Sequence, residues 1–312
     1  MMNLPSLRQL RYFVAIAQEL NFTRAAEACF VGQSTLSAGL KELEELLATR
    51  LVERDRQNVA LTPIGLEVLT RAKIILAASE DLVEFAIAVG KPMTGTIRLG
   101  VIPTIAPFLL PKVMPQLRAS FPDLKIALRE DLTANLLARL AEHQLDFALI
   151  ALPYETSGLM VKELFNDEFW LVAKENDSAL KGKQVHLPAN MAERLLLLEE
   201  GHCLREHTLQ ACKRSDIRHA DSMEATSLLT LLQMVESGMG IALLPEMAVK
   251  GGLLNGSSLV ARPLSPPAPK RIIALAARSS TAHIDEFEAL SAAIEEHFKG
   301  GLRVTRGMRK SI

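Results

Sequence analysis

The feature that most constrains the fold is a change of hydrophobic pattern near Thr96. Before this residue, apolar side chains recur at the three- and four-residue spacing of amphipathic helices. After it, short apolar strands alternate with helical segments, beginning with a strand at 97–101. Alternation of this kind builds a parallel sheet whose ligands bind at the carboxyl ends of the strands. The sequence therefore predicts an all-α N-terminal part followed by an α/β part.

The α/β part is expected to form two lobes. In the first, the pattern predicts strands at 97–101, 125–129 and 147–150 and helices at 108–120 and 133–142. The pattern repeats from Phe169 to Pro245, and a strand at 271–275 and a helix at 284–298 close the chain. Two such lobes with crossing connections resemble a periplasmic-binding-protein fold, with a cleft between them. The overall fold class is α/β with an N-terminal all-α winged helix-turn-helix.

Residues 1–61 predict three helices followed by a hairpin. Thr23 is expected to cap the second helix, whose inner face includes Cys29 as a core thiol. The third helix opens with short polar side chains, as a recognition helix does in the major groove. Residues 1–73 hold nine Lys/Arg against eight Asp/Glu, so net charge adds little, and a plain three-helix packing unit is the alternative. The candidate DNA contacts are Thr23, Arg24, Gln33, Ser34, Thr35, Ser37, Lys41, Arg50, Arg54 and Arg56.

A long amphipathic helix is expected to follow. Thr62 would cap it, and Pro63 suits its first position. Its apolar stripe lies on one face and indicates a dimerising helix. The predicted domains are 1–61 (winged helix-turn-helix), 62–91 (linker helix and hinge) and 92–312, with one lobe at about 92–165 plus 268–300 and the other at about 166–267. The basic tail after Glu296 is expected to be solvated and frayed.

Length and composition indicate a globular protein of more than one domain. The chain has 312 residues, of which 49% are apolar and 23% charged. Its first residues hold no apolar h-region, and no apolar run reaches roughly 18 residues, so we expect no secretory signal and no membrane span. We therefore expect a cytoplasmic protein, in which lasting disulfides are rare and transient ones usually perform redox chemistry.

Two cysteines carry the most specific chemical signal. Cys203 follows Gly-His and precedes Arg205 by two, and Cys212 stands nine positions after it. A helix start or a nearby cation would lower the pKa of such a thiol and favour its reactive thiolate. Nine residues of helix rise about 13.5 Å, whereas a disulfide needs Cα atoms within roughly 7 Å. If the two cysteines pair, the segment between them must refold, as it would in a switch.

Three alternatives stay open for this segment at this point. The two thiols could be ordinary buried side chains, because free cysteine is among the most buried residue types. They could bind zinc together with His202 and His207, although these ligands interleave and lack the usual paired spacing. A permanent disulfide is disfavoured by the expected compartment. We expect neither a metal ion nor a cofactor.

Two sets of short motifs carry a resemblance to known proteins. The N-terminal set is Phe22-Thr23-Arg24-Ala25-Ala26-Glu27, Gln33-Ser34-Thr35-Leu36-Ser37 and Leu61-Thr62-Pro63-Ile64-Gly65. The later set is Pro103-Thr104, Leu109-Leu110-Pro111, Gly201-His202-Cys203-Leu204-Arg205 with Cys212, Ala225-Thr226-Ser227-Leu228 and Gly240-Ile241-Ala242-Leu243-Leu244-Pro245. By these motifs the chain resembles the LysR-type transcriptional regulators over nearly its whole length, and by the later set it resembles their peroxide-sensing members. One departure is Gly32, where the family commonly has serine before the recognition helix; glycine still caps, somewhat less well.

The resemblance implies roles for individual residues. Cys203 would react with hydrogen peroxide to give a sulfenic acid, and Cys212 would resolve it to a disulfide. The alternatives are helix capping for the two threonines of the pocket, surface exposure for His202 and Arg205, and a sheet-edge salt bridge for Arg271. The implied peroxide pocket is Thr104, Thr133, His202, Arg205 and Arg271.

The resemblance also implies partners. They are promoter double-stranded DNA, a homodimer or homotetramer, RNA polymerase, and thiol reductants of glutaredoxin or thioredoxin type that reset the switch; no membrane is implied. Two rivals remain: a LysR-type regulator that answers a small organic effector in the cleft between the lobes, and a thiol peroxidase. The helix-turn-helix speaks against the enzyme, since a turnover catalyst does not need one.

Overall fold

The computed structural model describes residues 3–54, 59–88, 93–187, 194–211 and 224–307. They divide into two compact units. The N-terminal unit is built mainly from residues 1–89, and the C-terminal unit from most of the remainder.

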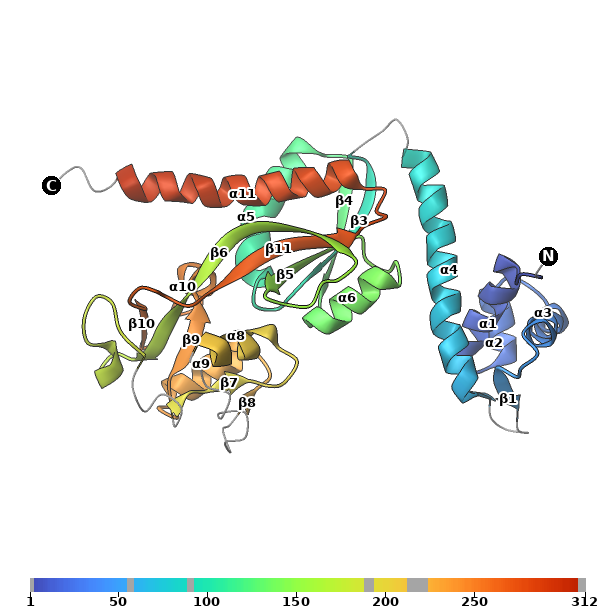
Figure 1. The fold of residues 1–312 in the computed structure, drawn as a ribbon, viewed down its shortest axis with the longest axis horizontal. Coiled ribbons are helices and arrows are strands. Elements are labelled where there is room, and N and C mark those ends of the chain that lie inside the picture. The colour runs from blue at the N-terminus through green and yellow to red at the C-terminus, as the bar shows by residue number, and fades with distance from the viewer. Residues whose placement is uncertain (1–2, 55–58, 89–92, 188–193, 212–223, 308–312) are drawn as a thin grey trace. The chain divides into compact units, whose positions relative to one another are not determined.

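The N-terminal unit is a winged helix-turn-helix (Figure 1). Its helices pack around buried side chains that include Phe13, Ile16 and Leu40. Gly39 allows close packing of its helix, because a Cβ there would lie 2.6 Å from the ring carbon Cδ2 of Tyr12. The three predicted helices and the two strands of the wing are confirmed, and the turn at 55–58 lies outside the described residues. The elements are α1 (Leu7–Glu19), α2 (Phe22–Ala28), α3 (Gln33–Leu46), β1 (Val52–Arg54), antiparallel β2 (Val59–Leu61) and α4 (Pro63–Ala88).

Two helix starts in this unit test the predicted caps. The cap of α2 is Asn21, whose side chain accepts hydrogen bonds from the N–H groups of Thr23 (2.9 Å) and Arg24 (3.0 Å). The prediction of Thr23 as the cap is wrong, because asparagine is the stronger cap and stands in position for it. Thr62 caps α4 as predicted, accepting from the N–H of Gly65 at 2.9 Å. Cys29 packs against the core but is only half-buried, so it is less enclosed than predicted.

The C-terminal unit is built on one seven-stranded sheet with the order β10-β6-β11-β5-β3-β4, and β9 also pairs with β6. A separate two-stranded sheet pairs β7 with β8. The elements are β3 (Gly95–Val101), α5 (Ala106–Ser120), β4 (Leu124–Glu130), α6 (Thr133–Ala141), β5 (Phe147–Leu152), β6 (Leu159–Lys174), η1 (Ser178–Leu180), β7 (Leu197–Leu198), α8 (Cys203–Ala211), β8 (Glu224–Ala225), α9 (Leu228–Glu236), β9 (Ala242–Pro245), α10 (Glu246–Lys250), β10 (Leu259–Pro263), β11 (Lys270–Arg278) and α11 (Ile284–Gly307).

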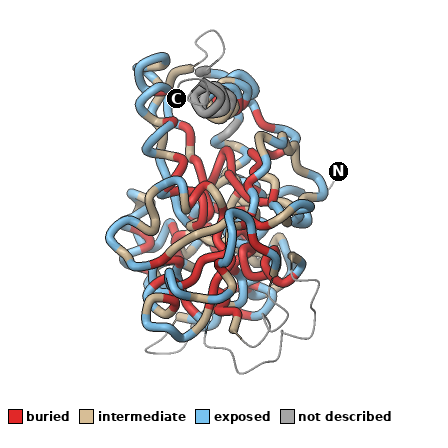
Figure 2. Tube along the Cα trace, turned by 90° about the vertical axis from the view of Figure 1, so that its left-hand side faces the viewer, coloured by how far each residue is buried: buried red, intermediate tan, exposed pale blue. Residues whose placement is uncertain are grey.

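Strand β6 joins two lobes of this unit (Figure 1). Its first half pairs with β11 beside the parallel strands β3, β4 and β5, which form the first lobe with α5, α6 and α11. Its second half pairs with β9 and β10 of the second lobe, which also holds β7, β8 and helices α8 to α10. Buried residues gather along these central strands (Figure 2).

The prediction of parallel strands is confirmed in the first lobe but not in the second. There, β9 and β10 run antiparallel to β6, and within the described residues parallel pairing is confined to β7 with β8 and two isolated bridges. The reason is that β6 enters the second lobe as one continuous strand, and the chain returns beside it in the opposite direction. The half-buried first half of β6 shows no clean alternation, so the sequence did not reveal it.

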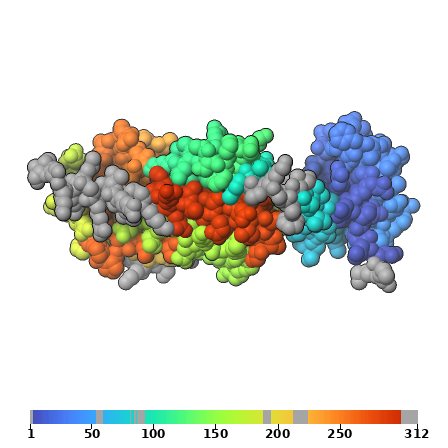
Figure 3. Space-filling view, turned by 90° about the horizontal axis from the view of Figure 1, so that it is seen from above, coloured from blue at the N-terminus to red at the C-terminus, as the bar shows by residue number. Residues whose placement is uncertain are grey.

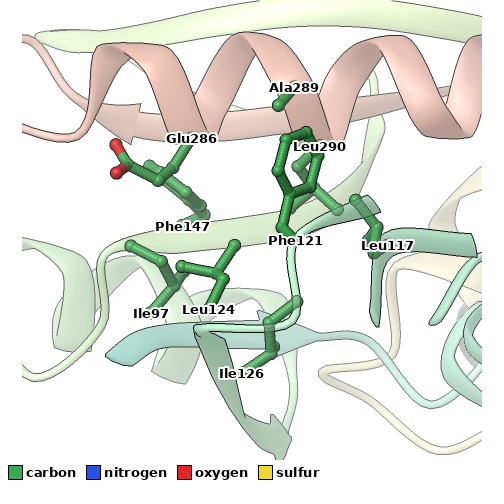
Figure 4. A pocket seen from close by; sticks show the side chains of 9 residues that line it. All are labelled: Ile97, Leu117, Phe121, Leu124, Ile126, Phe147, Glu286, Ala289 and Leu290. Carbon is green, nitrogen blue, oxygen red and sulfur yellow. The ribbon is translucent and has the colours of Figure 1, made fainter. Parts of the chain in front are cut away.

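Helix α11 contacts α5 and β6 and lies along one face of the C-terminal unit (Figure 3). It continues to Gly307, so the prediction of a frayed tail after Glu296 is wrong as far as that residue. A small cavity lies beneath it, walled by apolar side chains such as Phe121 and Phe147, with Glu286 at one side (Figure 4). Its volume of ≈10 Å³ is about that of one water site, so it is too small for an organic effector.

Candidate functional site

Cys203 is the first residue of α8, and its side chain is 7% exposed. A turn through Gly201, at a φ of +98°, brings the chain into the helix; glycine adopts this backbone conformation without strain. The N–H of Arg205 then donates to the carbonyl of His202 at 2.9 Å. The N–H groups of Cys203 and Leu204 approach the sulfur, as expected at a helix N-terminus. The thiol is therefore enclosed at a helix start.

Arg271 supplies a buried positive charge between the two lobes. It is 0% exposed, and its Nε and Nη2 donate to Oδ2 of Asp167 at 3.1 and 3.0 Å. Its Nη1 donates to the hydroxyl of Thr104 at 2.7 Å, and Nη2 donates to the Thr104 carbonyl at 3.1 Å. Arg271 and Asp167 face each other across β11 and β6. The salt bridge that the alternative named is therefore present, but both of its residues are buried rather than exposed at a sheet edge.

The two threonines are buried at the starts of helical segments but do not cap them. The hydroxyl of Thr104 accepts from Arg271, and α5 has no side-chain hydrogen bond at its cap. Thr133 is the first residue of α6, and its buried hydroxyl has no partner of ordinary hydrogen-bond geometry in the described ranges. That hydroxyl nevertheless interacts with the Cys203 thiol and acts to lower its pKa. The capping alternative is thus wrong for both, and both lie at the sulfur or at the arginine beside it.

The pKa of the Cys203 thiol is raised above its ordinary value. Burial is the main cause, and it outweighs the charge of Arg271, the Thr133 hydroxyl and the two backbone N–H groups, all of which lower the pKa. The helix start and the nearby cation that were expected to lower the pKa of Cys203 are therefore present, but the net shift of this pKa is upward. Cys203 is a protonated thiol at neutral pH.

His202 and Arg205 flank Cys203, and both are buried, so the alternative that they are surface groups is wrong. The pKa of His202 is lowered by burial, against the opposing charge of Glu199, whose carboxylate lies 3.9 Å from Nε2. Arg205 donates through Nη1 to the Leu198 carbonyl at 3.0 Å and to Glu224 at 2.6 Å. These bonds tie the start of α8 to β7 and β8.

His207 also belongs to this site, although its pattern in the sequence suggested only a possible zinc ligand. It lies one helical turn after Cys203 on α8, and its side chain is buried. Its Nε2 is 3.1 Å from the carbonyl oxygen of Pro153, whereas its buried Nδ1 has no partner within the described part of the chain. The i, i+4 spacing from Cys203 was the available signal, since such residues share a helix face. Among the described residues, no three His, Cys, Asp or Glu side chains are placed to share a metal ion.

Cys212 lies outside the described residues, as do the residues after it up to 223. Helix α8 ends at Ala211, the residue directly before it. The structure therefore defines one partner of the implied cysteine pair and the helix that leads to the other.

The N-terminal unit carries a second candidate site, a DNA interface. Gln33, Ser34 and Thr35 are exposed on the first turn of α3. The side chain of Arg54 and all of Arg56 lie outside the described part of the chain. Among the other candidates, Thr23 is exposed, Arg24 pairs with Glu19 at 3.2 Å and Lys41 pairs with Glu45 at 3.6 Å. An open groove of ≈430 Å³ runs beside α3, lined by Ser37, Ala38, Lys41, Glu44, Arg50 and Val52.

The described chain combines a winged helix-turn-helix unit with a two-lobed α/β unit, and comparison with known families shows which class of protein has this combination. Two family models match the chain. Residues 7–66 match the bacterial regulatory helix-turn-helix protein, lysR family, and residues 90–299 match the LysR substrate binding domain, whose fold is like that of periplasmic binding proteins. The chain belongs to the LysR family of transcriptional regulators, not to an enzyme family.

Three similar proteins illustrate the relationship. The HTH-type transcriptional regulator EstR of Acinetobacter baylyi is 41% identical over 92% of this chain and 95% of its own. A probable hydrogen peroxide-inducible genes activator of Streptomyces viridosporus is 40% identical over 94% of both. The solved structure of a full-length OxyR variant from Pseudomonas aeruginosa has a TM-score of 0.74 and 34% identity over 94% of this chain and 95% of that one.

Across the described residues, no helix combines the length and the apolar character that a membrane span requires.

Proposed function

We propose that this protein is a cytoplasmic LysR-type regulator that senses hydrogen peroxide through reversible Cys203–Cys212 disulfide formation and controls oxidative-stress genes. The observation that carries the proposal is the buried Cys203 thiol at the start of α8, beside Arg271 and Thr133. The name of the Streptomyces viridosporus relative, a probable hydrogen peroxide-inducible genes activator, supports the same signal.

The proposed chemistry needs only the two thiols and peroxide. A lone pair of the Cys203 sulfur attacks one peroxide oxygen, the O–O bond breaks, and the other oxygen leaves as water. The Cys212 sulfur then attacks the Cys203 sulfenic acid, which forms the disulfide and releases a second water. Arg271 and the Thr133 hydroxyl would stabilise the charge that develops on the leaving oxygen.

Helix α8 couples this chemistry to shape in the proposal. A helix that continued from Cys203 to Cys212 would separate their Cα atoms by about 13.5 Å, whereas a disulfide needs them within roughly 7 Å. The end of α8 would have to unwind for the bond to form. In our hypothesis this changes the contacts between C-terminal units in a homodimer or homotetramer, re-spaces the DNA-binding units on promoter DNA and alters the recruitment of RNA polymerase. Thiol reductants of glutaredoxin or thioredoxin type would reverse it.

The test is a pair of DNA footprints, with and without peroxide, on wild type, Cys203→Ser and Cys29→Ser. We expect the footprint to change in wild type and in Cys29→Ser, since Cys29 lies in the N-terminal unit. Cys203→Ser should bind DNA but give one footprint under both conditions. Mass spectrometry after sub-stoichiometric peroxide should show a Cys203–Cys212 linkage. An unchanged peroxide response in Cys203→Ser would refute the mechanism.

A regulator that answers a small organic effector is the second candidate. It is favoured by the relative at 41% identity, whose printed name, EstR, makes no mention of peroxide. Absence of the Cys203–Cys212 linkage after peroxide treatment would favour this candidate.

A further inference from the structure

We infer that His207 is the group that accepts the Cys203 proton when the sulfur is oxidised. The inference deepens the proposed peroxide sensing and rests on it. It makes His207 part of the reacting centre, although the sequence motif that marks the two cysteines does not include it.

The hydrogen bond to Pro153 fixes the tautomer of His207. A carbonyl oxygen can only accept, so the Nε2 that lies 3.1 Å from it must carry the proton. In the neutral ring the other nitrogen, Nδ1, then holds a lone pair. This Nδ1 is buried and has no hydrogen-bond partner among the residues that the structure describes. Buried polar atoms are nearly always paired, so an unpaired basic nitrogen here points to a transient partner.

Helix geometry brings Cys203 close to His207 as the candidate for that partner. Cys203 and His207 are four residues apart on α8, so their side chains lie on the same helix face with Cβ atoms about 5–6 Å apart. The positive charge of Arg271 lowers the pKa of both groups, so the same buried guanidinium acts on both. The groups that act on the ring are Arg271 from β11, the Pro153 carbonyl after β5, and Glu206 on α8 itself.

The protonation states of the two residues complement each other. Burial raises the pKa of Cys203, so the thiol keeps its proton at neutral pH although the thiolate is the nucleophile. Burial lowers the pKa of His207 below its ordinary value of 6.5, so the ring is neutral and free to accept. A reaction at neutral pH needs a proton acceptor beside this sulfur, and a positioned base contributes roughly 10²–10⁴-fold to such steps.

The step balances with peroxide as the oxidant. The Cys203 S–H proton moves to Nδ1 of His207 as the sulfur attacks the nearer peroxide oxygen and the O–O bond breaks. The departing oxygen takes the proton back from Nδ1 and leaves as water. The products are a Cys203 sulfenic acid, one water and His207 in its starting tautomer.

The test is the pH dependence of the rate at which peroxide consumes the Cys203 thiol in the full-length protein, measured by quenched alkylation and mass spectrometry. In wild type we expect a nearly flat rate between about pH 6.5 and 9, the ordinary histidine and thiol pKa values, because base and thiol are both in the required form. His207→Gln keeps an N–H donor for Pro153 but has no base. Its rate should fall about 10²-fold at pH 7 and rise tenfold per pH unit, following the thiolate.

Two further variants separate chemistry from structure. His207→Asn loses both the base and the bond to Pro153, and it should share the slow, rising profile. His186→Gln, an exposed histidine of the same unit, should behave as wild type. Operator binding in the reduced state checks folding, and His207→Asn supplies the test if His207→Gln does not fold.

The outcomes are distinct for the inference and for the function on which it rests. A wild-type Cys203 that resists stoichiometric peroxide would refute the proposed sensing. Oxidation of His207→Gln at the wild-type rate and with the wild-type profile would overturn the role of His207 alone. A slow His207→Asn beside a normal His207→Gln would also overturn it, because only the Pro153 bond would then matter.

Discussion

The N-terminal unit holds its candidate functional groups in solvent, whereas the C-terminal unit encloses them. Gln33, Ser34 and Thr35 are exposed on one turn of α3. Arg271, Asp167 and Cys203 are buried between two lobes and drawn from strands and helices far apart in the sequence. Exposed groups need only a helix that presents them, but buried charges need partners placed within hydrogen-bond distance. The candidate functional groups are therefore independent of one another in the N-terminal unit and interdependent in the C-terminal unit.

Among the substitutions that test this contrast, Asp167→Asn is expected to have the largest effect on stability. The substitution leaves the Arg271 charge buried without its carboxylate partner, and breaking such a pair costs about 3–5 kcal/mol. Trp170 lies three residues further along β6 and is the only tryptophan of the chain, so its fluorescence in a denaturant titration reports on this unit. Asp123→Asn, at an exposed position in the same unit, is the control and should change stability by less than about 0.5 kcal/mol. Equal stability of the two variants would break the comparison.

At the DNA interface, each substitution should change DNA binding independently of the others. If Gln33 reaches a base edge, Gln33→Ala should relax discrimination at one operator position by about 1–3 kcal/mol. If Arg50 contacts a phosphate, Arg50→Ala should weaken binding to all sequences and reduce the salt slope by about 1. Binding titrations over a salt series and an operator library separate these two effects. Neither variant should alter the rate of Cys203 oxidation, and a changed rate would contradict the independence of the exposed groups.

The pH dependence of stability should be a property of the C-terminal unit. The folded-state pKa of Cys203 is raised above 9.0, so stability is full below that pH and is lost as pH rises through the folded pKa. The pKa values of His202 and His207 are lowered below 6.5, so their stabilising contribution is present above that pH and is lost as pH falls. Trp170 fluorescence should therefore give maximum stability between about pH 6.5 and 9. Cys203→Ser should remove part of the alkaline loss, and His207→Gln part of the acid loss.

The smallest effect on stability is expected for an ion pair of the C-terminal unit that lies near solvent. Lys162 and Glu288 lie 2.6 Å apart, with side chains 33% and 58% exposed. Water screens such a pair, so Lys162→Met should change the free energy of unfolding by less than about 1 kcal/mol. A loss as large as that of Asp167→Asn would show that exposure does not set the value of an ion pair in this protein.

The predictability of each region follows from how local its signals are. The helices and wing of the N-terminal unit were predicted from apolar spacing and from the polar first turn of α3, and the structure confirms them. Even there, Asn21 rather than Thr23 caps α2, a competition between neighbours that spacing does not resolve. In the second lobe, the antiparallel strands beside β6 were missed because pairing partners far along the chain decide strand direction.

The candidate site divides in the same way. Cys203 at a helix start, with His202 and Arg205 beside it, could be singled out from a few consecutive residues. The partner of Arg271, the bonds of Arg205 and the burial of His207 could not, because each depends on strands or loops brought in from elsewhere.

By itself, the sequence determined the order of helices and strands in most of the chain, the family, and the residue types available for redox chemistry and DNA contact. Those properties depend on side-chain periodicity and short motifs, which act over a few residues. Only the tertiary structure decided that the Cys203 pKa rises rather than falls and that the buried Nδ1 of His207 has no hydrogen-bond partner among the described residues. Both depend on the removal of water from a site enclosed by two lobes, and desolvation arises only when distant segments close over it.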